Sequence, residues 1–293
     1  MPDGGEFRYD AATAISQGAR ERQEDAAIAD FPVGPGMGFA VLADGMGGHA
    51  AGDVASKIVV TEVFSELKLQ SGNTLALEQG ITRILHDAVH GANACVGQYS
   101  AQHSDSASMG ATLLAPVFIA DRLFWISVGD SPLFLIRNRV LTRLNAEHAI
   151  GSQMDYLVRN GLMQPDEVLN YPDQNCLTSV IGGGVIAQID CPTTPLRLRD
   201  GDILVAASDG LLTLTEDEIT KAVCDTRTLP ACEIGDALLH AIEDLADPNQ
   251  DNVTICVIKV RNLAANAGRG AVARSVLPRP LMDHAARSAG AGR

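Results

Sequence analysis

The sequence has little of what marks several large classes of protein. Aromatic residues make up only 4% of its 293 residues, and 36 acidic residues outnumber 22 basic residues, which gives a net charge of −14. Nucleic-acid-binding proteins usually carry a basic excess and often stack bases on aromatic side chains, so the composition argues against a nucleic-acid partner. A hydrophobic content of 46% allows a sizeable buried core.

Long apolar runs and paired cysteines are also missing. The longest apolar stretch, from Thr112 to Val128, is interrupted by Asp121 and Arg122, whereas a spanning helix needs about 20 apolar residues. The N-terminal segment MPDGGEFRYD is polar and lacks the apolar core of a signal peptide. None of the six cysteines forms a CxxC pair, so no zinc ribbon is predicted. We therefore expect a cytoplasmic protein without a transmembrane segment.

The charge is unevenly distributed. Residues 261–293 contain six arginines and one aspartate, so they contribute +5 and leave −19 for residues 1–260. The C-terminal segment is also rich in Ala and Gly and has no apolar periodicity. We expect a folded domain over residues 1–260 and a basic, disordered tail over residues 261–293.

Apolar periodicity predicts helices and strands in separate blocks. Amphipathic stripes predict helices over residues 54–67, 75–96 and 233–246. Short apolar runs predict strands over residues 39–43, 111–120, 122–128, 133–137, 140–143, 203–207 and 253–260. The breaks at Ala120-Asp121, Gly129-Asp130 and Asn138-Arg139 are typical of antiparallel hairpins. This arrangement favours an α+β fold built in layers.

Thr215 and Glu218 fit a capping box at the start of a further helix. Leu214 and Ile219 are placed to form its hydrophobic staple.

Acidic residues stand out at five places along the chain, four of which lie beside Gly or Asn near the end of a predicted strand. They are Glu24-Asp25, Asp44-Gly45, Gly129-Asp130, Asp209-Gly210 and Asp251-Asn252. A single Asp-Gly pair is an ordinary turn signal, but five such places in one chain suggest that they converge. Converging carboxylates repel one another unless cations neutralise them, and ligation by oxygen alone selects Mg²⁺ or Mn²⁺ over Zn²⁺.

Two further residues fit a metal site that handles an anion. Arg20 lies just before Glu24 and could clamp a phosphate group; the alternative is a solvated surface arginine. The glycine-rich loop after Asp44 leads to His49, which could act as a proton donor; the alternative is a structural or exposed histidine.

Together these segments resemble the metal-dependent protein serine/threonine phosphatases, the PPM or type 2C family, in its compact bacterial form. The matching segments occur in the family's order and span residues 12–260. They are Arg20–Asp25, Leu42–His49, Met109–Thr112, Val128–Ser131, Leu177–Gly182, Ala207–Leu211 and Asp251–Thr254.

The resemblance implies a four-layer αββα sandwich, with two antiparallel sheets flanked by helices on both faces. It also implies that Asp44 bridges two Mn²⁺ or Mg²⁺ ions, with the Gly45 carbonyl on one of them. Further expected ligands are Glu24 for the second ion, Asp209 and Asp251 for the first ion, and Asp130 with Asp209 for a third ion.

By the same resemblance, Arg20 would bind the substrate phosphate, Asp25 would orient metal-bound water, and His49 would be the general acid. Thr112 and Asn252 would support the site. The implied activity is hydrolysis of phosphoserine and phosphothreonine through a bridging metal-bound hydroxide. The implied partners are phosphoproteins and a bacterial Ser/Thr kinase that the enzyme reverses, and the protein is expected to be a monomer.

Residues 149–176 lie where bacterial members carry a flap beside the active site. The chain departs from the family pattern at Pro132, Gln23 and Glu147–Ala149, but none of these departures removes an expected metal ligand.

Two alternatives remain at this point. The segment Cys191–Arg197 matches the C-x5-R phosphate loop of thiol-based phosphatases, although Pro192 and Pro195 each remove an N–H group that such a loop needs. The second alternative is a phosphatase-like module that binds a phosphoprotein without turnover. Because every expected metal-ligand acid is present, activity is favoured over that alternative.

Overall fold

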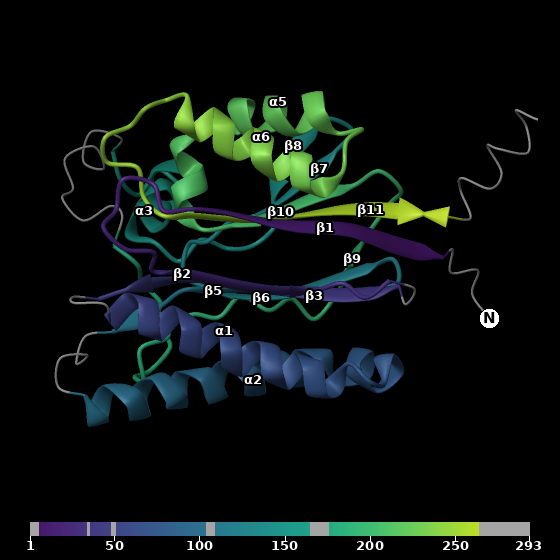
Figure 1. Ribbon diagram of the computed structural model, residues 1–293. Helices are drawn as coiled ribbons and strands as arrows, with labels where there is room; N and C mark the ends of the chain where they lie inside the picture. Colours follow the sequence, from purple (N-terminus) through teal and green to yellow (C-terminus); the bar gives the residue numbers. More distant parts are fainter. Residues whose placement is uncertain (1–5, 34–35, 48–50, 104–108, 165–175, 264–293) are drawn as a thin grey trace, which may run out of the picture.

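Two antiparallel sheets, stacked face to face, form the centre of the molecule. The computed structural model describes residues 6–33, 36–47, 51–103, 109–164 and 176–263. A pair of helices covers the outer face of each sheet (Figure 1). The predicted α+β fold, a four-layer αββα sandwich, is confirmed.

The first sheet has the strand order β1-β11-β10-β7-β8. Its strands are β1 (Phe7–Ser16), β7 (Leu133–Arg137), β8 (Val140–Arg143), β10 (Ile203–Ala207) and β11 (Val253–Asn262). The second sheet has the order β2-β3-β5-β6-β9, with β4 paired to β3. Its strands are β2 (Asp25–Asp30), β3 (Met37–Met46), β4 (Gly110–Ala111), β5 (Leu113–Ile119), β6 (Arg122–Val128) and β9 (Leu196–Arg197).

Helices α1 (Ala51–Gln70) and α2 (Thr74–Gln102) pack on the second sheet, and α5 (Glu216–Thr226) and α6 (Ala231–Glu243) pack on the first. The predicted capping box is present, because the Thr215 hydroxyl accepts the Glu218 N–H and the Glu218 carboxylate accepts the Thr215 N–H. Leu214 and Ile219 are both buried in the core beneath α5. Among the residues that the structure describes, none of the helices combines the length and apolarity that a bilayer crossing needs.

Each strand divides its side chains between two cores. In β11, Val253, Ile255 and Val257 face α5 and α6, whereas the alternate residues face the second sheet. Both faces of the central strands are therefore buried, which explains why these strands read as continuous apolar runs.

One predicted hairpin is wrong. Strands β5 and β6 form a hairpin, as do β7 and β8, but β6 and β7 belong to different sheets. At Gly129-Asp130 the chain crosses from one sheet to the other instead of turning back. Gly129 has φ +103°, and a Cβ there would lie 2.7 Å from the Thr112 side chain, so the crossing requires glycine. Asp130 is consequently placed at the junction of the two sheets.

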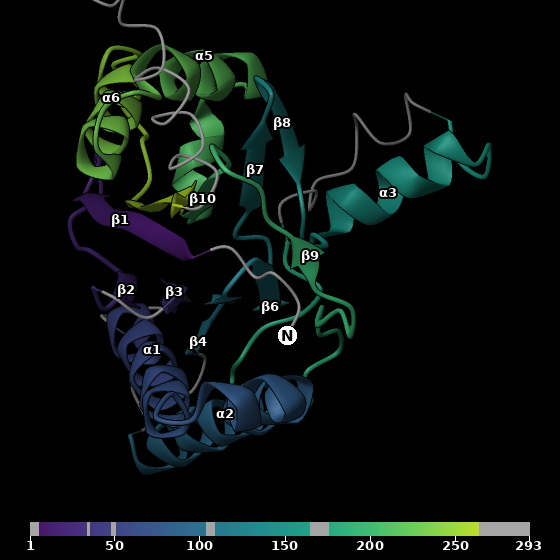
Figure 2. The ribbon, with the colours of Figure 1, turned by 90° about the vertical axis from the view of Figure 1, so that its right-hand side faces the viewer.

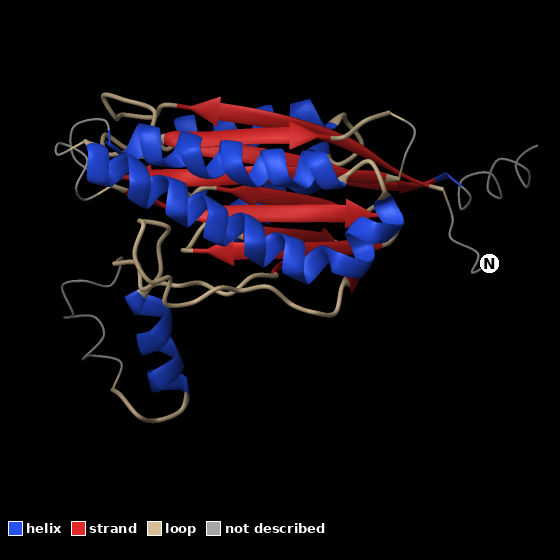
Figure 3. Cartoon of the chain, turned by 90° about the horizontal axis from the view of Figure 1, so that it is seen from below, coloured by secondary structure: helices blue, strands red, loops and turns tan. Residues whose placement is uncertain are grey.

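Helix α3 (Ile150–Arg159), together with the loop that follows it, stands away from the sandwich (Figures 2 and 3). Strand β11 extends through Asn262, two residues into the segment assigned to the tail, and pairs there with Phe7. The remainder of the predicted tail, residues 264–293, lies outside the described residues.

Candidate metal centre

A cavity of about 580 Å³ opens at one end of the sandwich, where strand ends from both sheets meet. Five carboxylate residues line it, and they are the predicted acids Glu24, Asp44, Asp130, Asp209 and Asp251. Arg20 and Gly45 line the same cavity. Asp25 lies beside it, opposite Asp44 in the β2–β3 register. His49 lies outside the described residues.

The topology explains why residues far apart in the sequence meet here. Asp44 is near the end of β3, and Glu24 directly precedes β2, which is antiparallel to β3. Asp209 follows β10 and Asp251 precedes β11, and these two strands are also antiparallel neighbours. In each pair the end of one strand lies beside the start of the other.

Asn252 joins the two sheets at this end. Its side-chain oxygen accepts the Glu24 N–H at 2.7 Å, and its amide group donates to the carbonyls of Gln17 at 2.8 Å and Arg22 at 2.9 Å. The side chain is only 5% exposed. Its hydrogen bonds therefore hold the loop that carries Arg20 and Glu24 against the start of β11.

Thr112 holds the end of β3 in a similar way. The Asp44 N–H donates to its hydroxyl at 2.9 Å, and the Thr112 N–H donates to the Asp44 carbonyl at 2.8 Å. The Thr112 and Ser131 hydroxyls are hydrogen-bonded at 2.9 Å. This network links β3 to the chain crossing that carries Asp130.

Gly45 lies in very close contact with backbone. A Cβ at this position would come within 2.0 Å of the Gly52 carbonyl oxygen and 2.6 Å of the Glu24 carbonyl oxygen. No other residue type fits without a shift of the main chain, so the start of α1 can approach β3 directly.

Asp25 and Asp209 each have a buried carboxylate oxygen without a hydrogen-bond partner in the described part of the chain. The Ser208 hydroxyl donates to Oδ2 of Asp25 at 2.7 Å, but Oδ1 of Asp25 is buried without a partner, and so is Oδ1 of Asp209. A buried carboxylate oxygen without a donor is costly. These oxygens therefore point to a bound cation or water.

Burial and mutual repulsion disfavour the charged forms of these acids. Burial, followed by the charges of Asp25 and Asp209, raises the pKa of Asp44. Burial, followed by the charge of Asp209, raises the pKa of Asp130 to about 6. A divalent cation would reverse this effect, and an all-oxygen donor set suits Mg²⁺ or Mn²⁺. The residues therefore fit such ions chemically.

The five carboxylates line one cavity, but their oxygens are not arranged as a ready-made set of metal ligands. Within the described ranges, no three His, Cys, Asp or Glu side chains are already placed to hold a metal ion together. Asp251 instead accepts a hydrogen bond from the Arg20 guanidinium at 2.5 Å. Metal binding would thus require small movements of side chains.

The comparisons with known proteins agree with this geometry. A family model described as protein phosphatase 2C matches residues 16–157. A serine/threonine phosphatase, Stp of Listeria monocytogenes, is 29% identical over 220 residues, which is 75% of this chain and 83% of Stp. PstP of Mycobacterium tuberculosis is 30% identical over 227 residues, 77% of this chain and 41% of PstP.

Solved structures extend the match to the whole sandwich. The crystal structure of the M. tuberculosis phosphatase PstP superposes with a TM-score of 0.70 at 28% identity and covers 87% of this chain and 99% of that one. The chain belongs to the protein phosphatase 2C, or PPM, family. Another structure of the PstP catalytic domain, with two manganese ions, covers 87% of this PPM chain and 99% of that one, with a TM-score of 0.67 at 28% identity.

The thiol-phosphatase alternative is not supported by the structure. Burial, followed by the charge of Asp190, raises the pKa of Cys191 to about 11, so its thiol is protonated at neutral pH. Arg197 is engaged by Asp121 at 2.5 Å and lies in β9. The match to C-x5-R in this PPM chain is therefore a coincidence of sequence.

One wall of the cavity is formed by the last residue of the predicted flap region and by residues just after it. Cys176, Leu177 and Val180 line it, and the Ile150 N–H at the start of α3 donates to the Cys176 carbonyl at 2.9 Å. His148 holds the base of this region, because its Nδ1 accepts the Gly129 N–H at 3.1 Å. Residues 165–175 of the predicted flap lie outside the described residues.

Sequence reasoning did not identify Ser208 and Ser131 as supporting residues. Each is adjacent to one of the predicted acids, Asp209 and Asp130. Their position next to these acids in the sequence was the one signal that could have found them. The hydrogen-bond partners of both hydroxyls come from distant segments.

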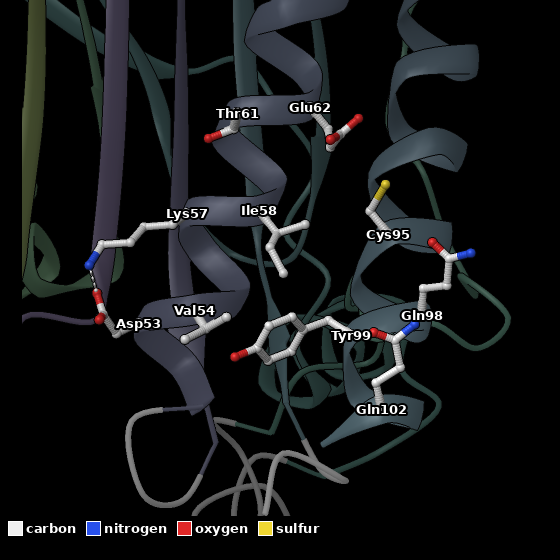
Figure 4. A pocket seen from close by; sticks show the side chains of 10 residues that line it. All are labelled: Asp53, Val54, Lys57, Ile58, Thr61, Glu62, Cys95, Gln98, Tyr99 and Gln102. Atoms are coloured by element: carbon white, nitrogen blue, oxygen red, sulfur yellow. Dashed lines mark ion pairs between the residues drawn. The ribbon is translucent and has the colours of Figure 1, made fainter. Parts of the chain in front are cut away.

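A separate cavity of about 480 Å³ lies between α1 and α2 (Figure 4). Its lining includes Cys95 and Tyr99 from α2, and Asp53, which is paired with Lys57 at 2.6 Å. No residue predicted from the sequence to belong to the site lines this cavity. The cavity therefore does not compete with the carboxylate cavity as the PPM active site.

Proposed function

We propose that the protein is a Mg²⁺- or Mn²⁺-dependent protein serine/threonine phosphatase that hydrolyses phosphoserine and phosphothreonine. The observation that carries this proposal is the meeting of five carboxylate residues and Arg20 in one cavity. Buried carboxylate oxygens without donors and an arginine at the rim suit cations that in turn bind a phosphate group.

Asp44 would be shared between two ions, with the Gly45 carbonyl on one of them. Asp209 and Asp251 would complete the first site, and Glu24 would serve the second. Asp130, with Asp209, would hold a third ion. Ions bound there supply positive charge that lowers the pKa of water and stabilises the negative charge on the phosphoryl oxygens.

The protein's own groups orient the reactants. The Arg20 guanidinium would bind two phosphoryl oxygens, which requires it to leave Asp251. The free Oδ1 of Asp25 would accept a hydrogen bond from water and so fix its orientation. His49 would donate a proton to the departing serine or threonine oxygen.

The biological setting of the proposal is the reversal of a bacterial Ser/Thr kinase in the cytoplasm. The substrates would be phosphoproteins, the catalytic domain would span residues 1–260, and the enzyme would act as a monomer. Residues 149–176 would contact the protein around the phosphorylated residue.

Hydrolysis assays test this proposal directly. Purified protein is given a phosphothreonine peptide or p-nitrophenyl phosphate with Mn²⁺, Mg²⁺ or EDTA. We expect turnover only with a divalent cation, loss of turnover in Asp44→Asn and full turnover in Cys191→Ser. Lack of turnover with every metal would contradict the proposal and would instead support a phosphoprotein-binding module.

A further inference from the structure

A second charged cavity lies at the opposite end of the first sheet. Strand β11 starts at Val253 beside the carboxylate cavity and ends at Asn262 on the other side of the molecule (Figure 1). At that far end a cavity of about 430 Å³ is present. The polar side chains that line this basic cavity belong to Arg227, Lys259, Arg261, Thr228, Asp200 and Asp202.

Strand alternation explains how the cations come together. The side chains of Val253, Ile255 and Val257 face α5 and α6. The same period of two places Lys259 and Arg261 on that face, beyond the end of the apolar core. Arg227 directly follows the last residue of α5 and reaches the cavity from above the sheet.

None of these three cations forms an ion pair within the described residues, whereas ten other Lys and Arg side chains there are paired. Lys259 is 6% exposed, and its ammonium group donates to the Leu229 carbonyl. The partial negative charge at the C-terminal end of α5 offsets at most about half of one positive charge. The helix end therefore compensates only a small part of the positive charge of these three side chains, in a protein whose net charge is −14.

The nearby carboxylates are engaged elsewhere. Asp202 accepts two hydrogen bonds from the Arg137 guanidinium, at 2.8 and 2.6 Å. Asp200 accepts a backbone N–H of β11 at 2.8 Å. Asp10, which lies opposite Lys259 in the β1–β11 register, accepts the Ala231 N–H at 3.1 Å. Only Asp202 is balanced by another cation, whereas Asp200 and Asp10 stay negative, and the charge of Asp10 acts on Lys259. None of these acids forms a direct ion pair with the cluster in the part of the chain that the structure describes.

We infer that the basic cavity binds an oxyanion of the phosphate class, either free inorganic phosphate or the phosphoryl group of a phosphorylated protein segment. Each guanidinium group can donate two parallel hydrogen bonds to two phosphate oxygens. The Lys259 ammonium and the Thr228 hydroxyl add further hydrogen-bond donors. A cluster of unpaired cations on an acidic protein also attracts anions from solution. This binding site is distinct from the carboxylate cavity at the other end of β11.

Calorimetric titration of the full-length protein in EDTA tests the inference. Without divalent cations the carboxylate cavity carries an excess of acids and repels phosphate, so binding reports on the basic cavity. One arm uses inorganic phosphate, and the other uses a phosphothreonine peptide with its unphosphorylated form as control. The variants are the double substitution Arg227→Gln/Arg261→Gln and, as a matched control, Arg159→Gln on α3. All three arginines are exposed, so the variants are expected to fold, which circular dichroism checks.

We expect the dissociation constant for phosphate to rise about tenfold for each arginine removed and to stay unchanged in Arg159→Gln. Binding of the phosphopeptide alone, lost in the double variant, would support the inference and assign the cavity to phosphoproteins. Absence of binding in both arms, or equal affinity in the double variant, would overturn it. Turnover of p-nitrophenyl phosphate with Mn²⁺ should be unchanged in the double variant, which separates this test from that of the proposed function.

Discussion

The two walls of the carboxylate cavity are built differently. The strand wall is formed by Glu24, Asp44, Asp209 and Asp251. It lies at the ends of β2, β3, β10 and β11, of which all but the edge strand β2 are buried on both faces. Buried side chains such as Thr112 and Asn252, which are 1% and 5% exposed, hold it from behind. The flap wall is formed by Cys176, Leu177 and Val180, which are exposed or half-buried.

The flap wall is attached to the sandwich mainly through backbone hydrogen bonds. Examples are the two bonds that join Ile181 to Ala111 of β4, both at 2.9 Å, and the bond from the Thr178 N–H to the His148 carbonyl at 2.8 Å. This contrast suggests a division of labour in which a rigid core fixes the residues proposed to perform the chemistry. The more exposed side chains of the flap wall can vary beside them and select the substrate.

The largest expected effect is on the strand wall, in Asp44→Asn. Loss of a ligand proposed to be shared by two ions should lower kcat/KM with Mn²⁺ by about a thousandfold or more, since metal ions contribute several kcal/mol to catalysis. Steady-state kinetics with p-nitrophenyl phosphate measures this. Asp87→Asn, on the exposed face of α2, is the matched control and should keep full activity. Comparable rates in the two variants would contradict the role of Asp44.

A glycine substitution tests how tightly the strand wall is packed. A Cβ at Gly45 would collide with the Gly52 carbonyl, so Gly45→Ala should lower the free energy of unfolding by about 2–3 kcal/mol. Gly91→Ala in α2 meets no atom within 4 Å and should instead raise it by about 0.5–1 kcal/mol. Urea denaturation of the metal-free variants checks both signs. If Gly45→Ala left the free energy of unfolding unchanged, the main chain at this end of the sheet would be able to shift and accommodate a Cβ atom.

The flap wall should respond differently. Leu177→Ala removes an apolar contact from the cavity and should raise KM for a phosphopeptide about fivefold. Turnover of the small substrate p-nitrophenyl phosphate should not change. Leu162→Ala, also near α3 but outside the cavity lining, serves as control. If Leu177→Ala slowed both substrates equally, the separation of the two walls would be wrong.

The smallest expected effect concerns the base of the flap. Burial lowers the pKa of His148, whose neutral Nδ1 accepts the Gly129 N–H. The unfolded chain takes up this proton near pH 6.5 while the folded protein resists it. The stability that His148 contributes is therefore present above pH 6.5 and is lost as the pH falls below it.

Thermal unfolding at pH 7.5 and 5.5 tests this contribution. The variant His148→Asn keeps an acceptor but does not titrate, so it should lose less stability than the wild-type protein over this range. If both proteins lost the same stability between these pH values, protonation of His148 would not destabilise the folded protein.

The sequence predicted several strands well because an apolar run bounded by turn residues is a signal within a few neighbouring residues. The predicted strands 122–128, 133–137, 140–143 and 203–207 match the observed bounds. Strands β1 and β2 were missed because they are rich in Ala, and α3 was missed because only Met154 of its residues is buried.

The site was predictable only in part. Four of the acids could be found because each stands near the end of a predicted strand beside Gly or Asn, whereas Glu24 was found as part of an acidic pair with Asp25. Their supports could not, because the bonds from Asn252 to Glu24 and from Ser208 to Asp25 join residues 228 and 183 positions apart. Nor did the local pattern at Gly129 reveal that the chain changes sheets there. Such contacts depend on the topology of the whole sandwich.

The most direct test of the metal centre is calorimetric titration of Mn²⁺ into the metal-free wild-type protein and into Asp44→Asn. We expect the wild-type protein to bind at least two Mn²⁺ ions per chain, as two ions that share Asp44 require, and Asp44→Asn to lose this binding. Absence of Mn²⁺ binding, or equal stoichiometry and affinity in Asp44→Asn, would contradict this expectation.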